Sequence, residues 1–125
     1  MSVNKVILLG NVGRDPKMSF PSKGHAVAQF TMATNERKRA TENSPETERT
    51  EWHNIVMMGR NAELADRYIR KGTRLYVEGK LRTRSWNDKN GITHYITEIY
   101  VDNFELLGNK TTSDTPPSDA SQGEE

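Results

Sequence analysis

Residues 79–86 have the sequence Gly79-Lys80-Leu81-Arg82-Thr83-Arg84-Ser85-Trp86, in which cationic side chains alternate with apolar or neutral ones. Because successive strand side chains point to opposite faces, a β-strand sorts this stretch into two rows. One row holds Leu81 and Thr83, which can line a core together with Leu75 and Val77 upstream. The other row holds Lys80, Arg82, Arg84 and Trp86. The alternation therefore predicts a long strand with one core face and one cationic face.

The cationic row has a chemistry that suits a polyanion with unpaired bases. Cations attract phosphate groups, and a flat indole offers a surface on which a base can stack. The row therefore favours single-stranded nucleic acid as a ligand. The alternative is a solvated strand face that carries one apolar cap, and this stretch alone does not decide between the two.

The rest of the chain predicts five strands and one helix. Apolar runs and alternation indicate strands at 3–9, 25–34, 50–58, 73–86 and 92–107, with a short extended piece at 17–20. Asn61 is expected to cap a helix that ends before Gly72, between the third and fourth strands. Gly79 is expected to bend the fourth strand, and 102–103 to form a bulge in the fifth.

Two polar stretches separate or follow these elements. Residues 35–49 are polar throughout and predict a long loop, and residues 87–91 predict a hairpin turn. The order of strands around a single helix predicts an all-β fold with one helix, namely a five-stranded OB-fold barrel, over residues 1–108. A disordered acidic tail is expected over residues 109–125, because from residue 111 on only Ala120 is apolar.

The composition indicates one basic domain. The 125 residues fit one core, and the 33% of hydrophobic residues and the mean hydropathy of −0.86 are low because of the polar tail. Through Lys110 there are 18 basic and 13 acidic residues, a formal net charge of +5, and four acidic residues follow. A basic body favours a polyanionic partner, and an acidic tail can compete weakly for the same surface.

Several classes of protein and site are disfavoured. The chain has no cysteine, and we expect neither a secretory signal nor a membrane span in it. The three histidines lack partners at ligand spacing, so no metal and no cofactor is expected. Glu46, Glu48 and Glu51 lie in or beside a polar stretch without a catalytic constellation, so no enzymatic activity is expected.

Several ordered segments resemble the bacterial-type single-stranded DNA-binding proteins over about residues 2–108. They are 3–11 (VNKVILLGN), 15–16 (DP), 50–53 (TEWH), 68–72 (YIRKG) and 77–86 (VEGKLRTRSW). The resemblance implies an OB domain that assembles as a homotetramer and wraps single-stranded DNA without sequence preference. It further implies a role in replication, recombination and repair, and a place in the bacterial cytoplasm with the nucleoid.

The resemblance also implies site residues. Its stacking tryptophans fall on Trp52 and Trp86, although the half-apolar face of Trp52, considered without the family, favours a core position. Its phosphate contacts fall on Arg60, Lys71, Arg82 and Arg84, to which the patterns of charge add Lys38 and Lys80. Excess apolar surface on the first strand predicts subunit contacts at Val6 and Leu8, with His53 and Tyr76 at or near them.

The chain departs from the family pattern at three places. Lys38 or a neighbour replaces an aromatic residue in the loop after the second strand, and Met58 replaces a phenylalanine, so stacking is reduced in favour of charge. The sequence ends in Glu124-Glu125 without the apolar pair that replication and repair proteins bind in family tails. Recruitment of such partners through the tail is therefore not expected in the usual mode.

Two other functions remain open from the sequence. One is an OB-fold adaptor that docks on replication proteins, with DNA affinity secondary, which the reduced stacking set would suit. The other is a small nuclease, against which the absence of clustered acidic residues counts. Quenching of tryptophan fluorescence by oligo(dT) and incubation with labelled DNA and Mg²⁺ distinguish the three.

Overall fold

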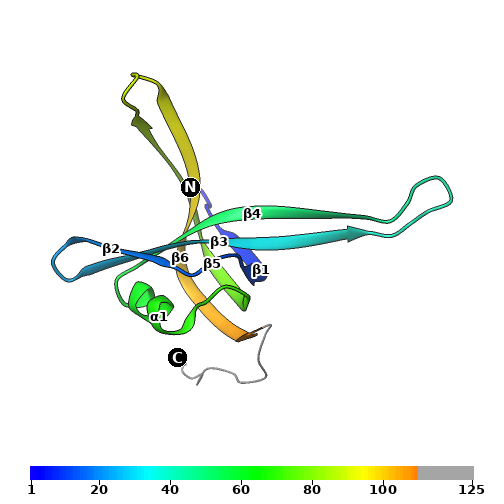
Figure 1. The fold of residues 1–125 in the computed structure, drawn as a ribbon, viewed down its shortest axis with the longest axis horizontal. Helices are drawn as coiled ribbons and strands as arrows, with labels where there is room; N and C mark the ends of the chain where they lie inside the picture. The colour runs from blue at the N-terminus through cyan, green and yellow to red at the C-terminus, as the bar shows by residue number, and fades with distance from the viewer. Residues whose placement is uncertain (110–125) are drawn as a thin grey trace.

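The computed structural model describes residues 1–109, which form six strands and one short helix (Figure 1). The elements are β1 (Val6–Val12), β2 (Lys17–Ser22), β3 (His25–Lys38), β4 (Thr47–Met58), α1 (Arg60–Tyr68), β5 (Thr73–Asn87) and β6 (Thr93–Asn109). The five expected strands and the position of the helix are confirmed, and the short extended piece is β2. The tail predicted for 109–125 lies, from residue 110 on, outside the described residues.

The strands form one sheet that closes on itself. Their order is β1-β5-β6-β4-β3-β2, and β1 also pairs with β3 at Asn11↔Ala33 and Val12↔Met32, which completes a barrel. All pairs are antiparallel except β4 with β6, which run parallel at Ile55↔Ile99 and Val56↔Tyr100. The barrel confirms the OB-type fold expected from the order of elements.

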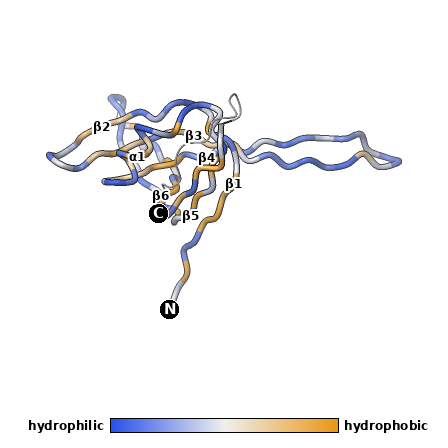
Figure 2. The backbone as a smooth tube through the Cα atoms, turned by 90° about the horizontal axis from the view of Figure 1, so that it is seen from below, coloured by the Kyte–Doolittle hydropathy of each residue, from blue (hydrophilic) through white to orange (hydrophobic). Residues whose placement is uncertain are grey.

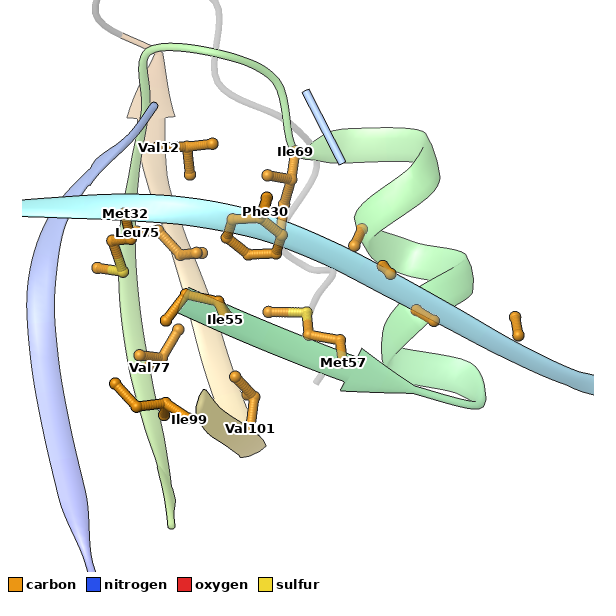
Figure 3. Close-up of a cluster of buried hydrophobic side chains, with 14 residues drawn as sticks. Val12, Phe30, Met32, Ile55, Met57, Ile69, Leu75, Val77, Ile99 and Val101 are labelled. Atoms are coloured by element: carbon orange, nitrogen blue, oxygen red, sulfur yellow. The ribbon is translucent and has the colours of Figure 1, made fainter. Parts of the chain in front are cut away.

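The core lies inside the barrel and under α1 (Figure 3). Strand alternation sends Phe30 and Met32 of β3 and Ile55 and Met57 of β4 inward, where all four are almost fully buried. The helix contributes only its small residues Ala62 and Ala65, with Ile69 just beyond its end. The remaining buried hydrophobic members of this cluster are Val12, Ala26, Ala28, Leu75, Val77, Ile99 and Val101.

Gly79 is the point at which β5 leaves the barrel. A Cβ at this position would overlap the backbone carbonyl of Tyr100, so only glycine lets the two strands approach this closely. The register also shifts here, since Glu78 pairs with Asn103 whereas Gly79 pairs with Val101, which leaves Asp102 as the extra residue. The expected bend and the expected bulge are therefore one feature.

Beyond Gly79 the predicted core row is wrong. Leu75 and Val77 are fully buried, but Leu81 is 49% exposed and Thr83 is exposed. The reason is that β5 and β6 continue past the barrel as a two-stranded hairpin, which has no second layer to cover its inner face (Figure 1). Alternation identified the two faces of the strand, but it carried no information on where the barrel ends.

The loop predicted for residues 35–49 is too long: residues 39–46 lie outside the strands, but 35–38 and 47–49 belong to them. β3 runs to Lys38 and pairs with β4 from Thr47, so that a polar two-stranded arm extends from the barrel (Figure 2). Polar contacts hold the arm together: the Thr50 hydroxyl donates to Asn35 Oδ1 across the strands at 2.8 Å, and Arg37 Nε lies 3.3 Å from Oε2 of Glu46, the residue before β4. A backbone ladder needs no apolar side chains, which is why the polar sequence resembled a loop.

The helix cap and the start of the first strand differ from expectation. Gly59, with φ +61°, is the N-cap and no side chain caps the helix, while Asn61 lies inside it and donates to the Asp102 carbonyl at 3.5 Å. A position with positive φ favours glycine, and this is why Gly59 rather than Asn61 is the N-cap. The first strand begins at Val6 rather than at residue 3, and extends to Val12.

The boundary at Gly79 predicts different costs for two leucines of one strand. Leu75→Ala should lower the free energy of unfolding by about 2–5 kcal/mol, because it leaves a cavity in the core. Leu81→Ala, the matched control on the hairpin, should change it by no more than about 0.5 kcal/mol. Urea unfolding followed by circular dichroism measures both, and equal costs would contradict the boundary.

Candidate nucleic-acid interface

The cationic row of β5 lies on the outer face of the sheet, beside a row of β6. In the register of the two strands its members pair across with residues of mixed chemistry: Lys80↔Tyr100, Arg82↔Glu98, Arg84↔Ile96 and Trp86↔His94. The β6 row continues onto β4, because Tyr100 pairs with Val56. The outer faces of β5, β6 and β4 therefore form one surface, which we call the cationic face.

Trp86 is held near the tip of the β5–β6 hairpin with much of its ring open. The side chain is 45% exposed, and its ring stacks on His94 with centroids 5.3 Å apart. His94 Nε2 lies 2.7 Å from Asp88 Oδ2, and that hydrogen bond is the main cause that lowers the pKa of Asp88. Asp88 also accepts the backbone N–H groups of Asn90 and Ile92, so one carboxylate orders the turn and orients the histidine.

Arg82 and Arg84 have different surroundings on the same row. Arg84 donates through Nε and Nη2 to the two carboxylate oxygens of Glu98, at 2.9 and 3.4 Å, and these hydrogen bonds raise the pKa of Arg84. The Arg82 guanidinium instead lies 4.7 Å from the ring centroid of Tyr100. One arginine is thus paired with a carboxylate and the other lies over an aromatic ring.

Trp52 lies on the outer face of β4 and is 56% exposed, which excludes the core alternative for this side chain. Its ring covers Gly13, where a Cβ would overlap it, and the Gly13 N–H donates to the Thr31 carbonyl at 2.8 Å. The missing side chain at Gly13 makes room for the indole. Trp52 therefore rests on backbone on one side and is open on the other.

Met58 and the two basic residues around α1 lie near the edges of this surface. Met58 follows Trp52 along the same face of β4 and is exposed, whereas Val56 between them is buried. Arg60 is the exposed first residue of α1. Lys71 is exposed after the helix, and its backbone N–H donates to Asp15 Oδ1 at 2.8 Å, two residues along the chain from Gly13.

Lys38 is exposed near the end of the β3–β4 arm, paired with Thr47. Ala33 is the partner of Trp52, and Lys38 follows it by five residues, so alternation puts Lys38 on the opposite face of the arm. Arg37, four residues from Ala33, shares the face of Trp52. The structure thus brings the neighbour, and not Lys38, to the tryptophan side.

The predicted subunit contacts divide between the core and the surface. Val6 and Leu8 are partly buried against the core, and the outward apolar side chains of β1 are instead Ile7 and Leu9. Tyr76 pairs with Leu9 on this outer face, and its hydroxyl donates to Glu78 Oε2 at 2.6 Å, which raises the pKa of Tyr76. The half-buried His53 Nε2 lies 2.9 Å from Thr34 Oγ1.

Sequence reasoning missed three residues that shape this surface: Gly13, His94 and Glu98. His94 and Glu98 had a partial signal, since the predicted hairpin puts them on the strand beside β5; but a turn at 87–91 would pair Trp86 with Ile92, whereas the observed turn at 88–92 pairs Trp86 with His94 and Arg82 with Glu98. Gly13 had none, because its contact with Trp52 joins the residue after β1 to β4, and the two are distant in the sequence.

Two further observations bear on the class of site. Within residues 1–109, no group of three or more His, Cys, Asp or Glu side chains could hold a metal ion. Over that same range, no helix has the length and apolar character needed to cross a membrane.

The contact of Gly13 with Trp52 generates a prediction. Gly13 does not require a positive φ, so Gly13→Ala should leave the backbone unstrained, but its Cβ would overlap the indole ring of Trp52 and the Thr31 hydroxyl, and both side chains must move. In a Trp86→Phe background Trp52 is the sole tryptophan, and its emission maximum should shift when alanine is introduced. An emission spectrum identical to that of Trp86→Phe alone would show that the ring does not rest on Gly13.

Comparisons with known proteins place this chain in a family. The model of the single-strand binding protein family matches residues 3–107. A curated "Single-stranded DNA-binding protein" of Bacteroides thetaiotaomicron is 50% identical over 129 aligned residues, which cover 100% of this chain and 80% of the relative. The solved structure "Plasmodium falciparum SSB complex with ssDNA" is 38% identical with a TM-score of 0.78, covering 86% of this chain and 97% of that one. The chain belongs to the single-strand binding protein family.

Proposed function

We propose that this protein binds single-stranded DNA without sequence preference and protects it during replication, recombination and repair. The observation that carries the proposal is the pair of exposed indoles, Trp52 and Trp86, on an outer surface that also bears a row of cations. Membership of the family and the likeness to a structure solved with single-stranded DNA support it.

The chemistry of the cationic face suits a strand whose bases are unpaired. Lys80 and Arg82 attract the phosphate backbone, and Trp52 and Trp86 stack on bases. Stacking and charge act on any sequence, because every base has a π-face and every nucleotide has a phosphate. Sequence independence follows from this division of contacts.

The remaining predicted contacts extend the path of the strand. Met58 offers a polarizable thioether on the face of Trp52, and Arg60 and Lys71 add charge at the two ends of α1. At the β3–β4 arm we assign the phosphate contact to Arg37 on the tryptophan side, with Lys38 contributing long-range attraction from the opposite face.

We further propose that four copies assemble through the outer face of β1. Ile7 and Leu9 are exposed apolar side chains there, and Tyr76 adds an aromatic ring beside Leu9. Apolar side chains grouped on one strand face are typical of association surfaces. Val6 and Leu8 support this strand from the core side, and His53 is expected near the same contacts.

The proposed role is one of binding, with no bond formed or broken, in the bacterial cytoplasm with the nucleoid. Proteins of replication and repair are proposed partners. The family is one of DNA-binding proteins, and this agrees with a non-catalytic role.

Alanine at either tryptophan tests the stacking role. Trp52→Ala and Trp86→Ala should each weaken oligo(dT) binding by about 1–3 kcal/mol, the usual cost of losing one stacked base. Tyr95→Ala is the matched control, because Tyr95 is exposed on the same hairpin but pairs with Ser85 on the opposite face. Titration by fluorescence anisotropy measures all three. Unchanged affinity in both tryptophan variants would refute the stacking role of the two indoles, and absence of oligo(dT) binding by the unaltered protein would refute the proposed function.

A charge on the outer face of β1 tests the assembly. Ile7→Glu with Leu9→Glu should convert a tetramer to smaller species, since burying two carboxylates without partners is costly. Phe20→Glu, an exposed apolar position on β2, should leave the mass unchanged. Light scattering at micromolar concentration gives the masses. A tetramer that survives the double substitution would put the interface elsewhere.

A further inference from the structure

A buried carboxylate lies in the middle of the cationic face. Glu98 is only 3% exposed, and it pairs across the hairpin with Arg82 on the same outer face as Lys80, Arg84 and Trp86. A negative charge reduces the attraction of a surface for phosphate. Its position beneath a row of cations therefore needs a structural reason.

The contacts of Glu98 supply that reason. Arg84 donates to both of its carboxylate oxygens, at 2.9 and 3.4 Å, and the Tyr100 hydroxyl donates to Oε1 at 3.4 Å. A forked pair of this kind fixes the plane of the guanidinium. A phosphate that took Arg84 away would leave Glu98 buried and unpaired, which is strongly unfavourable.

The other side of Arg84 faces the proposed stacking residue. Its guanidinium carbon lies 5.5 Å from the ring centroid of Trp86. The side chain thus links the buried carboxylate to the indole, and it limits the positions that the ring can take. Arg84 therefore supports the position of the indole ring, and we call this supporting role a brace.

Arg82 lacks such a partner. Within residues 1–109 it makes no ion pair with a carboxylate, and its guanidinium lies over the ring of Tyr100. That ring is itself tied to Glu98 through its hydroxyl. Arg82 therefore has a fixed support and an uncompensated charge, as a phosphate contact requires.

We propose that Glu98 is a positioning residue of the DNA-binding surface, which neutralises Arg84 and holds it as a brace for Trp86. Phosphate attraction on this row then comes from Arg82 and Lys80. This assignment rests on the proposed function, and it removes Arg84 from the set of predicted phosphate contacts.

The dependence of affinity on salt separates the two roles. Each phosphate neutralised on a single strand changes the slope of log K against log[salt] by about 0.7, so its contribution to affinity falls about 2.6-fold between 50 and 200 mM salt. A brace acts through stacking and leaves that slope unchanged. We would titrate (dT)10, which lies within the roughly 4–16 nucleotides that one OB fold covers, at several salt concentrations.

Three variants are compared with the unaltered protein. Arg82→Gln should lower the magnitude of the slope by about 0.7, as a lost phosphate contact. Arg84→Gln combined with Glu98→Gln should weaken binding by the same factor at every salt concentration, with the slope unchanged. Glu98→Gln alone releases the charge of Arg84 and should steepen the slope by about 0.7. Circular dichroism reports whether each variant folds, and the double variant carries the test if Glu98→Gln does not.

The outcomes separate the two proposals. If the salt slope of Arg84→Gln with Glu98→Gln decreases as much as that of Arg82→Gln, Arg84 contacts a phosphate. That result would overturn the role of Glu98 and leave the proposed function intact. A folded Glu98→Gln with the slope of the unaltered protein would do the same. Absence of any (dT)10 binding by the unaltered protein would overturn the proposed function and this assignment together.

Discussion

The close approach of β5 to the backbone of Tyr100 at Gly79 is the constraint on which the rest of the structure depends. On one side of this point the inward side chains of β5 are buried in the barrel, and on the other side they are exposed on a hairpin. The bulge at Asp102 accompanies the same bend. Because the hairpin has no second layer, its outer face is free to carry cations and an indole while the barrel below retains its core.

The two long arms extend the barrel by the same physical means. A ladder of backbone hydrogen bonds continues beyond the core, with polar cross-strand pairs such as Thr50–Asn35 in place of apolar ones. An arm of this kind exposes most of both of its faces, although Glu98 on the β5–β6 hairpin is buried under Arg84. A small domain can in this way offer a surface wider than its barrel to an extended ligand, at the cost of strands that carry little core packing of their own.

Apolar runs, alternation and helix-end signals in the sequence were enough to predict the five strands, the single helix and the cationic row. The prediction failed where one local sequence pattern is compatible with two different structures. A polar stretch forms a loop or a ladder, and residues 35–49 gave no sign of which. Four consecutive apolar residues from Val6 to Leu9 show no alternation, so the inward and outward pairs could be assigned only from the register with β5. The cap at Gly59 depended on a positive φ. A glycine can adopt this conformation, but its presence in a sequence does not show that it does.

The site was harder to predict than the fold, because a sequence shows which residues are charged but not which residues those charges contact. Lys80, Arg82 and Arg84 look equivalent along the strand, and only the pairing of β5 with β6 separates them, by putting a buried carboxylate under one and an aromatic ring under another. A formal count of cations therefore overstates the charge that a ligand meets. A stacking ring must also be held in place, and a guanidinium braced by a carboxylate can hold it without adding net charge. On this view the acidic residue of the cationic face belongs to the binding surface, because it determines which of its cations attract and which of them support.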